Sequence, residues 1–360
     1  MALLTGRRVT RRWVLGRAWR AGLALPLAGC LACSRQPAGV ATPVSGRSAH
    51  TATLLPDGSI LVVGGIGSGP LTSAQRVFPA TGRWVEAGRL SAARADHTAT
   101  LLPDGTVIVA AGDGANLAGA AIASAERFDP ATGRWAGDAS LATPRMRHQA
   151  VALADGTVLA IGGIAGWRVG DRPLATVERY DPTTRRWCPA APLTVPRDGG
   201  AALRLADGRV LAIGGTGSAA TSADMYDPAS DRWTLTAAPG QTHYSARAAL
   251  LADGRICVAG GTARPELYDP LTDVWTPVAP APFLVDTVTR GATPDAPLLL
   301  LGVLAIVRFD AGTASWQAAP PAAPRSGGRA VPLPNGTIAL VGGGTSPGAA
   351  GPPPLEIYRP

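Results

Sequence analysis

The pattern that decides the fold is first met at Arg47-Ser-Ala-His-Thr-Ala-Thr-Leu-Leu-Pro-Asp-Gly-Ser-Ile-Leu-Val-Val-Gly-Gly65. It returns five times, at residues 94–112, 145–163, 197–215 and, with more changes, at 243–261 and 325–343. A second pattern follows most copies, with an acid, an aromatic residue, Asp-Pro-x-Thr and a Trp, as in residues 126–135. One unit is therefore repeated along nearly the whole chain after residue 36, and the repeat has to be interpreted before any single motif.

The spacings within the unit indicate its strands. The turn Asp or Asn precedes the first position of the Gly pair by seven residues in every copy, as from Asp57 to Gly64. This constancy predicts a tight hairpin, in which Asp-Gly supplies the positive φ angles of a two-residue turn. The aromatic residue precedes Trp by seven residues through Asp-Pro-x-Thr, which predicts a second tight turn. The interval between the Gly pair and the aromatic residue varies, so insertions are expected there.

Four short strands per unit of 41 to 52 residues predict one propeller blade per unit. The Gly pair, the Tyr and the Trp resemble the Kelch repeat family, which includes the central domain of galactose oxidase. The resemblance implies an all-β, Kelch-type β-propeller with seven four-stranded blades over residues 37–360. Six blades remain an alternative, because the unit between Trp275 and Trp316 has lost its Asp-Gly turn and its second Gly.

The end of the chain suggests how the ring closes. The last unit stops at Pro360, before any Trp strand. Residues 37–44 stand in the register of an outer strand, because Pro37 precedes His50 by the same 13 residues that separate Trp84 from His97. We therefore expect an N-terminal strand to complete the last blade and to cover an otherwise open sheet edge.

Composition supports a turn-rich β protein and argues against a nucleic-acid partner. The 360 residues include 45 Gly and 33 Pro, while 46% are apolar, which favours a large all-β body over a helical or disordered chain. All 33 basic residues are Arg, and the net charge is +8. Six of these Arg residues precede residue 30, where no acid occurs, so the rest of the chain carries 8 − 6 = +2. A nearly neutral body has no strong attraction for a polyanion.

The N-terminus resembles a bacterial export signal. Thr10-Arg11-Arg12-Trp13-Val14-Leu15 resembles a twin-arginine leader, with general secretion as the other route, and a short apolar run follows. Leu27-Ala28-Gly29-Cys30 then resembles a lipobox, with Cys30 as the lipidated residue. Residues 1–29 are interpreted as the signal and 30–36 as a tether, which predicts a lipoprotein in the periplasm or on the cell surface. Ordinary cleavage, with Cys30 as a bystander, is the alternative.

The sharpest binding candidates form a column of Arg at one register of the repeat. Five guanidinium groups near a pore mouth, at the end that carries the variable loops, would attract a carboxylate or an anionic sugar. The other interpretation is structural, because an acid also recurs at one register and blade six lacks both residues. The five candidates are Arg47, Arg94, Arg145, Arg197 and Arg325.

Two further sets of side chains are candidates for a functional site. His50, His97 and His148 recur at one register, which favours a role in the repeat over metal ligation. Trp167, in the longest variable loop beside Arg168, is a binding candidate, with stapling of the loop as its alternative. The cysteine spacings are not those of a metal site. No metal, no cofactor and no catalytic residue is predicted.

The sequence therefore predicts a binding or scaffold protein. A monomeric, lipid-anchored propeller would recognise a protein or a carbohydrate through its variable-loop face. The alternative is an enzyme resembling sugar mutarotases or epimerases, acting on an anionic sugar at an Arg-lined pore mouth, and it rests on the fold-level resemblance. Copper radical oxidases with Kelch repeats carry a further C-terminal domain and a copper site, neither of which is expected here.

Overall fold

The computed structural model describes residues 46–67, 69–114, 119–167, 171–260, 264–283, 285–290, 292, 296–302, 305–310, 313, 315–320, 322–323, 325–344 and 354–360. All of them belong to one compact unit, Ala38–Pro360. The predicted export signal, the tether and the expected closing strand at 37–44 lie outside the described residues. Within the described residues, no helix is both long enough and apolar enough to cross a membrane.

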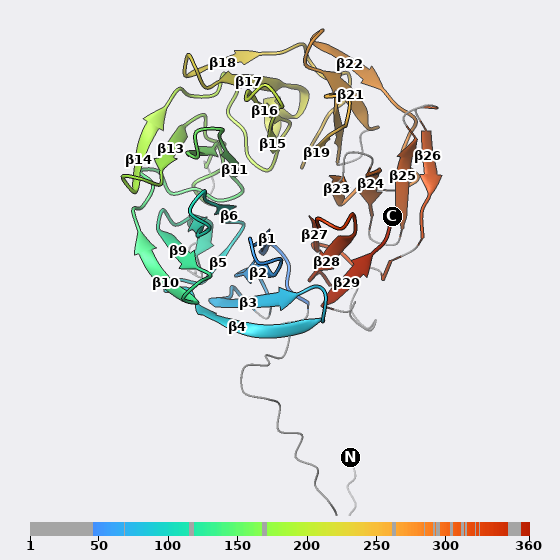
Figure 1. Ribbon diagram of the computed structural model, residues 1–360. Helices are drawn as coiled ribbons and strands as arrows, with labels where there is room; N and C mark the ends of the chain where they lie inside the picture. The colour runs from blue at the N-terminus through green and yellow to red at the C-terminus, as the bar shows by residue number, and fades with distance from the viewer. Residues whose placement is uncertain are drawn as a thin grey trace, which may run out of the picture. The chain divides into compact units, whose positions relative to one another are not determined.

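Seven antiparallel sheets follow one another along the chain and form a ring (Figure 1). Blade one contains β1 (Thr51–Leu54), β2 (Ile60–Val63), β3 (Ser73–Phe78) and β4 (Arg83–Arg89). Blade two contains β6 (Thr98–Leu101), β7 (Val107–Ala110), β9 (Ala125–Asp129) and β10 (Arg134–Asp138). Blade three contains β11 (Gln149–Ala152), β12 (Val158–Ile161), β13 (Val177–Asp181) and β14 (Arg186–Ala190). Blade four contains β15 (Ala201–Arg204), β16 (Val210–Ile213), β17 (Ala223–Asp227) and β18 (Arg232–Leu235).

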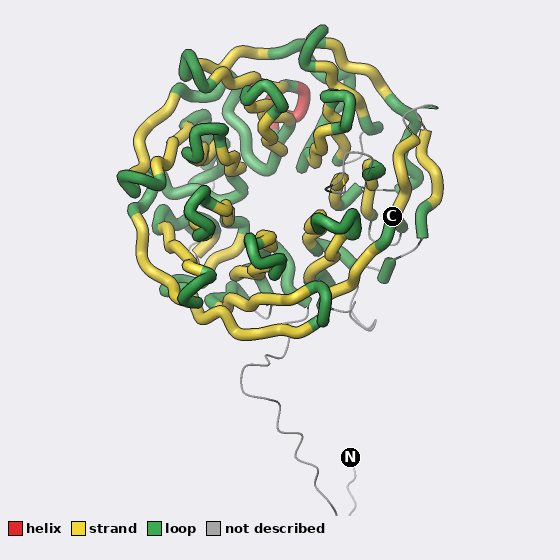
Figure 2. Tube along the Cα trace, viewed as in Figure 1, coloured by secondary structure: helices red, strands yellow, loops and turns green. Residues whose placement is uncertain are grey.

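The remaining three blades repeat the same order. Blade five contains β19 (Arg247–Leu250), β20 (Ile256–Ala259), β21 (Glu266–Asp269) and β22 (Val274–Pro277). Blade six contains β23 (Thr287–Arg290), β24 (Leu298–Leu301), β25 (Ile306–Asp310) and β26 (Ser315–Ala318). Blade seven has three described strands, β27 (Arg329–Pro332), β28 (Ile338–Val341) and β29 (Leu355–Tyr358). Outside the blades, β5 (Arg94–Ala95) pairs with β8 (Asp113–Gly114), and a 3-10 helix, η1 (Gly217–Thr221), is drawn red in Figure 2.

The hydrophobic core is divided into clusters that lie between neighbouring blades. The second strand of every blade is buried at all four positions, because another blade covers each of its faces. Ile60 and Val62 of blade one, for example, pack with Ala339 and Val341 of blade seven. Since such clusters join each successive pair of blades, apolar burial holds the ring together.

Three kinds of contact close the ring between blades seven and one. The inner strands β27 and β1 lie in contact, as do the inner strands of each successive pair of blades. The backbone N–H of Gly343 donates to the Arg47 carbonyl at 3.0 Å, and Arg329 Nε donates to the His50 carbonyl at 2.8 Å. Blade six is a complete four-stranded sheet despite its lost turn sequence. The prediction of a seven-bladed, all-β propeller is confirmed, and the six-bladed alternative is wrong.

The first hairpin turn differs from the predicted two-residue turn. In blade one, Leu55 N–H donates to Ser59 O at 2.8 Å and Gly58 N–H donates to Leu55 O at 3.0 Å, so three residues form the loop. Gly58 has a positive φ of 79°, whereas Asp57 has an ordinary one. The Asp57 carboxylate instead accepts hydrogen bonds from the Ser59 backbone N–H and hydroxyl, which fixes the turn from the side.

The recurring Trp connects the outer strands to the core. In blades two to six it lies opposite the aromatic residue of the third strand, with ring centroids 4.7 to 5.0 Å apart. In blade one, Val77 takes the place of that aromatic residue beside Trp84. Trp135 also donates from Nε1 to the Ala87 carbonyl of blade one at 2.6 Å, so it joins two blades.

The expected closing strand gives the first prediction. Deleting residues 37–44 should lower the melting temperature by about 5 °C or more, because the outer edge of blade seven loses its partner strand. Deleting residues 31–36 is the matched control and should change it little. Differential scanning calorimetry of the two truncated proteins measures the difference, and equal melting temperatures would show that 37–44 is no part of the propeller.

Candidate functional site

The predicted Arg column lies inside the blades. The five side chains are between 0 and 7% exposed. Arg145 illustrates the geometry: its Nη1 donates to the carbonyls of Gly162 at 2.7 Å and Thr176 at 2.9 Å, and its Nη2 donates to Glu178 Oε1 at 2.7 Å. Glu178 in turn accepts the backbone N–H groups of Ala142 and Thr143 from the preceding inter-blade segment. The pair therefore ties together the Gly pair, the variable loop and the inter-blade connection.

The same arrangement recurs around the ring. The buried Arg–acid pairs are Arg94–Glu126 at 2.8 Å, Arg145–Glu178 and Arg197–Asp224 at 2.7 Å, and Arg325–Glu356 at 2.6 Å. Arg47 of blade one faces Gln75 in place of the acid register and donates to Gly64 O and Ser73 Oγ. Burial lowers the pKa of Arg47 to about 10, against the opposing effect of Glu86.

Blades five and six use different pairs at this register. In blade five His243 replaces Arg and its Nε2 lies 2.9 Å from Glu266 Oε2. In blade six the register places Phe283 and Val307 at the Arg and acid positions, and both belong to one apolar cluster. An apolar pair can replace a buried ion pair when both partners change together.

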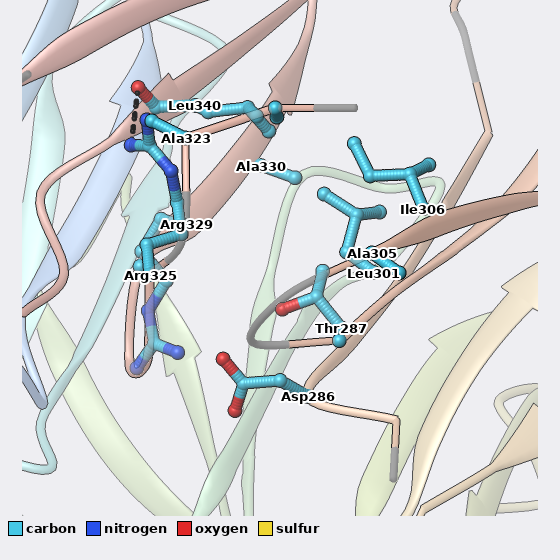
Figure 3. A pocket seen from close by; sticks show the side chains of 13 residues that line it. Asp286, Thr287, Leu301, Ala305, Ile306, Ala323, Arg325, Arg329, Ala330 and Leu340 are labelled. Atoms are coloured by element: carbon cyan, nitrogen blue, oxygen red, sulfur yellow. Dashed lines mark hydrogen bonds between the residues drawn. The ribbon is translucent and has the colours of Figure 1, made fainter. Parts of the chain in front are cut away.

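The geometry therefore supports a structural role for the Arg column, and its role in ligand binding stays a prediction. Arg325 is the member that borders a cavity. Figure 3 shows this space between blades six and seven, with the hydrogen bond from Arg325 to the Leu340 carbonyl. The cavity measures about 20 Å³, room for little more than one water molecule. Cys30 and Arg168 lie outside the described residues.

A much larger cavity of about 450 Å³ lies on the propeller axis. It is lined by the first residues of the inner strands, such as Thr51, Thr98 and Gln149, and by the residues that precede them. By chain connectivity, inner strands begin at the end of the propeller that carries the variable loops and inter-blade connections. The cavity thus opens at the end that the sequence predicted for ligands.

Three Arg side chains that are not part of the column line this cavity. Arg147 donates from Nη1 to Asp198 Oδ2 at 3.0 Å. Arg247 donates to the carbonyls of Asp286, Ser245 and Ala246, and Arg329 donates to the His50 carbonyl. Burial lowers the pKa of Arg247 and of Arg329. Arg147 lowers the pKa of Arg247 further, and Arg247 lowers that of Arg329, against the raising effects of Asp286 and Asp96. Arg247 and Arg329 stay charged at physiological pH, as guanidinium groups in proteins do.

Asp96 is the acid of this cavity. Its carboxylate makes no hydrogen bond and no ion pair with any other described residue. Burial raises the pKa of the Asp96 carboxyl above its ordinary value, against the lowering effect of Arg147, Arg329 and Arg247. The three Arg residues come from blades three, seven and five, so the carboxyl senses charges from across the channel.

Asp96 and Arg147 occupy strained backbone positions at one register. The equivalent residues in six blades have φ between 49° and 68°, and two of them are glycines: Ala49, Asp96, Arg147, Gly199, Ser245 and Gly327. Their backbones form an inter-blade chain, because Asp96 N–H donates to Ala49 O and Arg147 N–H donates to Asp96 O, both at 3.0 Å. Left-handed φ disfavours side chains other than Gly, and retained strain of this kind clusters at functional sites.

The histidine column links neighbouring blades beneath the cavity. His97 Nε2 lies 3.0 Å from Thr51 Oγ1, and His148 Nε2 lies 2.9 Å from Thr98 Oγ1, so each ring contacts the preceding blade. Burial lowers the pKa of His148 to about 3 and that of His97 well below its ordinary value. In the described part of the chain, no group of three or more His, Cys, Asp or Glu is placed to hold a metal ion.

Trp167 reaches the cavity through Arg147. Its ring is 52% exposed, and the Arg147 guanidinium carbon lies 5.3 Å from the ring centroid. Its backbone N–H donates to Gly119 O of the blade-two loop at 3.1 Å. The residue therefore staples two variable loops and also offers an aromatic face beside a cavity Arg, so the structure brings one of the sequence candidates to the site.

The comparisons with known proteins agree with the propeller fold. A family described as Kelch motif matches residues 145–194, which cover blade three. Kelch-like protein 35 of Mus musculus is 29% identical over 186 residues, or 51% of this chain and 25% of that protein. The chain thus spans about a quarter of that relative's length. The solved structure titled "Structure of YjhT" has a TM-score of 0.57 and 14% identity, covering 89% of this chain and 99% of that one.

This chain is a seven-bladed β-propeller, one blade of which matches the Kelch motif. The propeller keeps its repeated residues for packing and places its single-copy residues around the axis. Sequence reasoning missed Asp96, Arg147, Arg247 and Arg329 because it looked for residues that recur. A usable signal was present, since each of these residues interrupts a register that is filled by small or uncharged residues in most other blades.

The buried ion pairs give the second prediction. Arg145→Ala should lower the free energy of unfolding by about 3 to 5 kcal/mol, because Glu178 stays buried without its charged partner. Arg186→Ala, at an exposed Arg of the same blade, is the control and should stay within about 0.5 kcal/mol. Urea denaturation measures both. The Arg145→Ala/Glu178→Ala double variant should lose less than the sum of the singles, and strict additivity would contradict the pairing.

The strained Asp96 gives the third prediction. Asp96→Gly should raise the free energy of unfolding by up to about 1 kcal/mol at neutral pH, because Gly relieves the left-handed φ. A carboxyl whose folded pKa is raised costs stability above that pKa, and this cost disappears once pH falls below the unfolded value. The gain should therefore shrink towards pH 4. Ser245→Gly, at the same register without a charge, should show no such pH dependence in urea titrations.

Proposed function

We propose that this Kelch propeller is an exported, lipid-anchored binding protein that recognises a protein or a carbohydrate through its variable-loop face. The axial cavity is its central binding site. Kelch propellers commonly act as protein-binding scaffolds, and that coarser role follows from the fold and the matched motif.

The cavity is the observation that carries the proposal. Its volume of about 450 Å³ is in the range of ligand pockets. Hydroxyl, amide, guanidinium and carboxyl groups line it side by side, for example Thr98, Gln149, Arg247 and Asp96. Strained φ angles at Asp96 and Arg147 keep two charged side chains at the cavity where Gly would cost less.

The export and anchoring parts of the proposal rest on the N-terminal sequence. Leu27-Ala28-Gly29-Cys30 resembles a lipobox, and a diacylated Cys30 would hold the propeller near a membrane through residues 30–36. A tethered propeller can present its variable-loop face to ligands outside the cytoplasm.

A second candidate function is enzymatic, of the sugar mutarotase or epimerase type. Asp96 favours it, because burial raises the pKa of this cavity carboxyl and three Arg side chains face it. A carboxyl of raised pKa exchanges protons at higher pH than an ordinary one, and the Arg groups would orient an anionic sugar. The Arg column named from the sequence is not required for this chemistry, because its side chains are buried in the blades and four of the five form ion pairs there.

The anchor gives the fourth prediction. Cys30→Ala should abolish labelling by a radioactive fatty acid and release the protein from membranes, because Cys30 is the only proposed acceptor thiol. Cys33→Ala, three residues later, is the matched control and should stay labelled. Label that persists in Cys30→Ala would refute the lipid anchor without touching the cavity proposal.

The cavity gives the fifth prediction. The mature protein is applied to an array of oligosaccharides and peptides, and Gln149→Trp should abolish its binding because the larger ring fills the axial cavity. Arg204→Trp, on the inner strand β15 but outside the cavity, is the control and should bind as the parent does. Unchanged binding by Gln149→Trp would place the site elsewhere. For any anionic sugar that binds, NMR exchange between anomers separates catalysis from binding alone.

A further inference from the structure

Two cavity Arg side chains hold their charges without a carboxylate partner. Arg247 and Arg329 donate only to backbone carbonyls, at 2.8 to 3.1 Å. Among the described residues, no carboxylate oxygen lies within 4.0 Å of a guanidinium nitrogen of Arg247 or Arg329. Arg147, by contrast, forms an ion pair with Asp198. Both guanidinium groups keep donors for a further acceptor, and both border the same cavity.

Two carboxylates, Asp286 and Asp96, act electrostatically on Arg247 and Arg329 without forming an ion pair with either. Of the two, Asp96 borders the same cavity as the Arg side chains. The backbone there is held at a φ of 49°. A carboxylate held near two unpaired guanidinium groups offsets part of their charge, and an anion that enters the cavity has to compete with it.

We propose that Arg247 and Arg329 bind one oxoanion group, a carboxylate or a sulfate, in the axial cavity, and that Asp96 is the competing carboxylate that weakens this binding until it is protonated. The inference rests on the proposed function and names its ligand chemistry. A planar guanidinium group can donate two parallel hydrogen bonds to two oxygens of such an anion. Neutral ligands do not offer this pair of charged acceptors.

The other charged groups around Asp96 do not account for the expected pH dependence. Arg147, Arg247 and Arg329 face it from three other blades, and of these Arg247 and Arg329 stay protonated as guanidinium groups in proteins do. The neighbouring His97 and His148 have pKa values lowered by burial, that of His148 to about 3 and that of His97 well below its ordinary value. Asp113, on β8 outside the blades, has a pKa raised by burial and by Asp96. Asp113 does not line the cavity, but it has to be tested as a second titrating group.

The experiment is a calorimetric titration of the mature protein with sodium sulfate, at constant ionic strength set with chloride. Sulfate keeps its charge between about pH 4.5 and pH 8, so any pH dependence belongs to the protein. Affinity should rise about tenfold as the pH falls over this range. The Asp96→Asn variant should bind sulfate at pH 7.5 as tightly as the parent protein does at low pH, and its affinity should not change with pH. Asn tolerates the left-handed backbone, so this variant is expected to fold.

Matched variants test the Arg pair. Arg247→Gln should lose at least about tenfold in sulfate affinity, while Arg204→Gln, an exposed Arg outside the cavity, should lose none. Arg329→Gln is expected to lose sulfate affinity to a similar extent. Because this residue also bridges blades seven and one, the melting temperature of the variant is measured as well. The same titrations are repeated with sodium acetate at pH 7.5 to test a carboxylate ligand. They distinguish a site that binds both anions from one that is selective for sulfate.

Each outcome tests a different part of the inference. A parent protein that binds neither sulfate nor acetate overturns the inference, and the array experiment with Gln149→Trp still tests the proposed function independently. Oxoanion binding that is insensitive to Arg247→Gln overturns the site. A pH profile that is unchanged in Asp96→Asn but flat in Asp113→Asn overturns the role of Asp96.

Discussion

The propeller depends on an Arg–acid ion pair that recurs in blades two, three, four and seven. A planar guanidinium can bond several acceptors at once, and Arg145 bonds the carbonyl of the Gly pair at Gly162, the end of the variable loop at Thr176 and the acid Glu178. The acid then holds the backbone that leads in from the previous blade. Variable loops can differ in length because this clamp fixes both of their ends.

The close approach of neighbouring blades explains why Gly is needed beside the clamp. A Cβ on Gly64 would lie 2.4 Å from the Arg94 carbonyl oxygen of the next blade, and the Gly65 N–H donates to that same oxygen. The same contact from Gly343 to Arg47 closes the ring. Apolar burial between blades supplies the attraction, and these polar contacts set the register at which the blades meet.

The fold could be predicted from sequence because its decisive residues recur at constant spacing. The seven residues from Asp57 to Gly64 fixed the hairpin, although its turn has three residues rather than two. Blade six was harder to predict from sequence, because Phe283 and Val307 replace the polar pair. Phe309 and Trp316 still indicated its outer strands. The site was not predicted: the Arg column lies in the blades, and only the folded ring brings Asp96, Arg247 and Arg329 to one cavity.

Symmetry explains why recurrence and function point to different residues. Seven similar blades present seven similar positions to the axis, but a small ligand there has no sevenfold symmetry. Its charged group needs donors from a few blades and inert surface from the others. Departures from the repeat at axial registers therefore carry more information on binding than its invariant positions. In this propeller these departures are Arg247 and Arg329 where blades one, two and six have Thr, and Asp96 and Arg147 where blades four and seven have Gly.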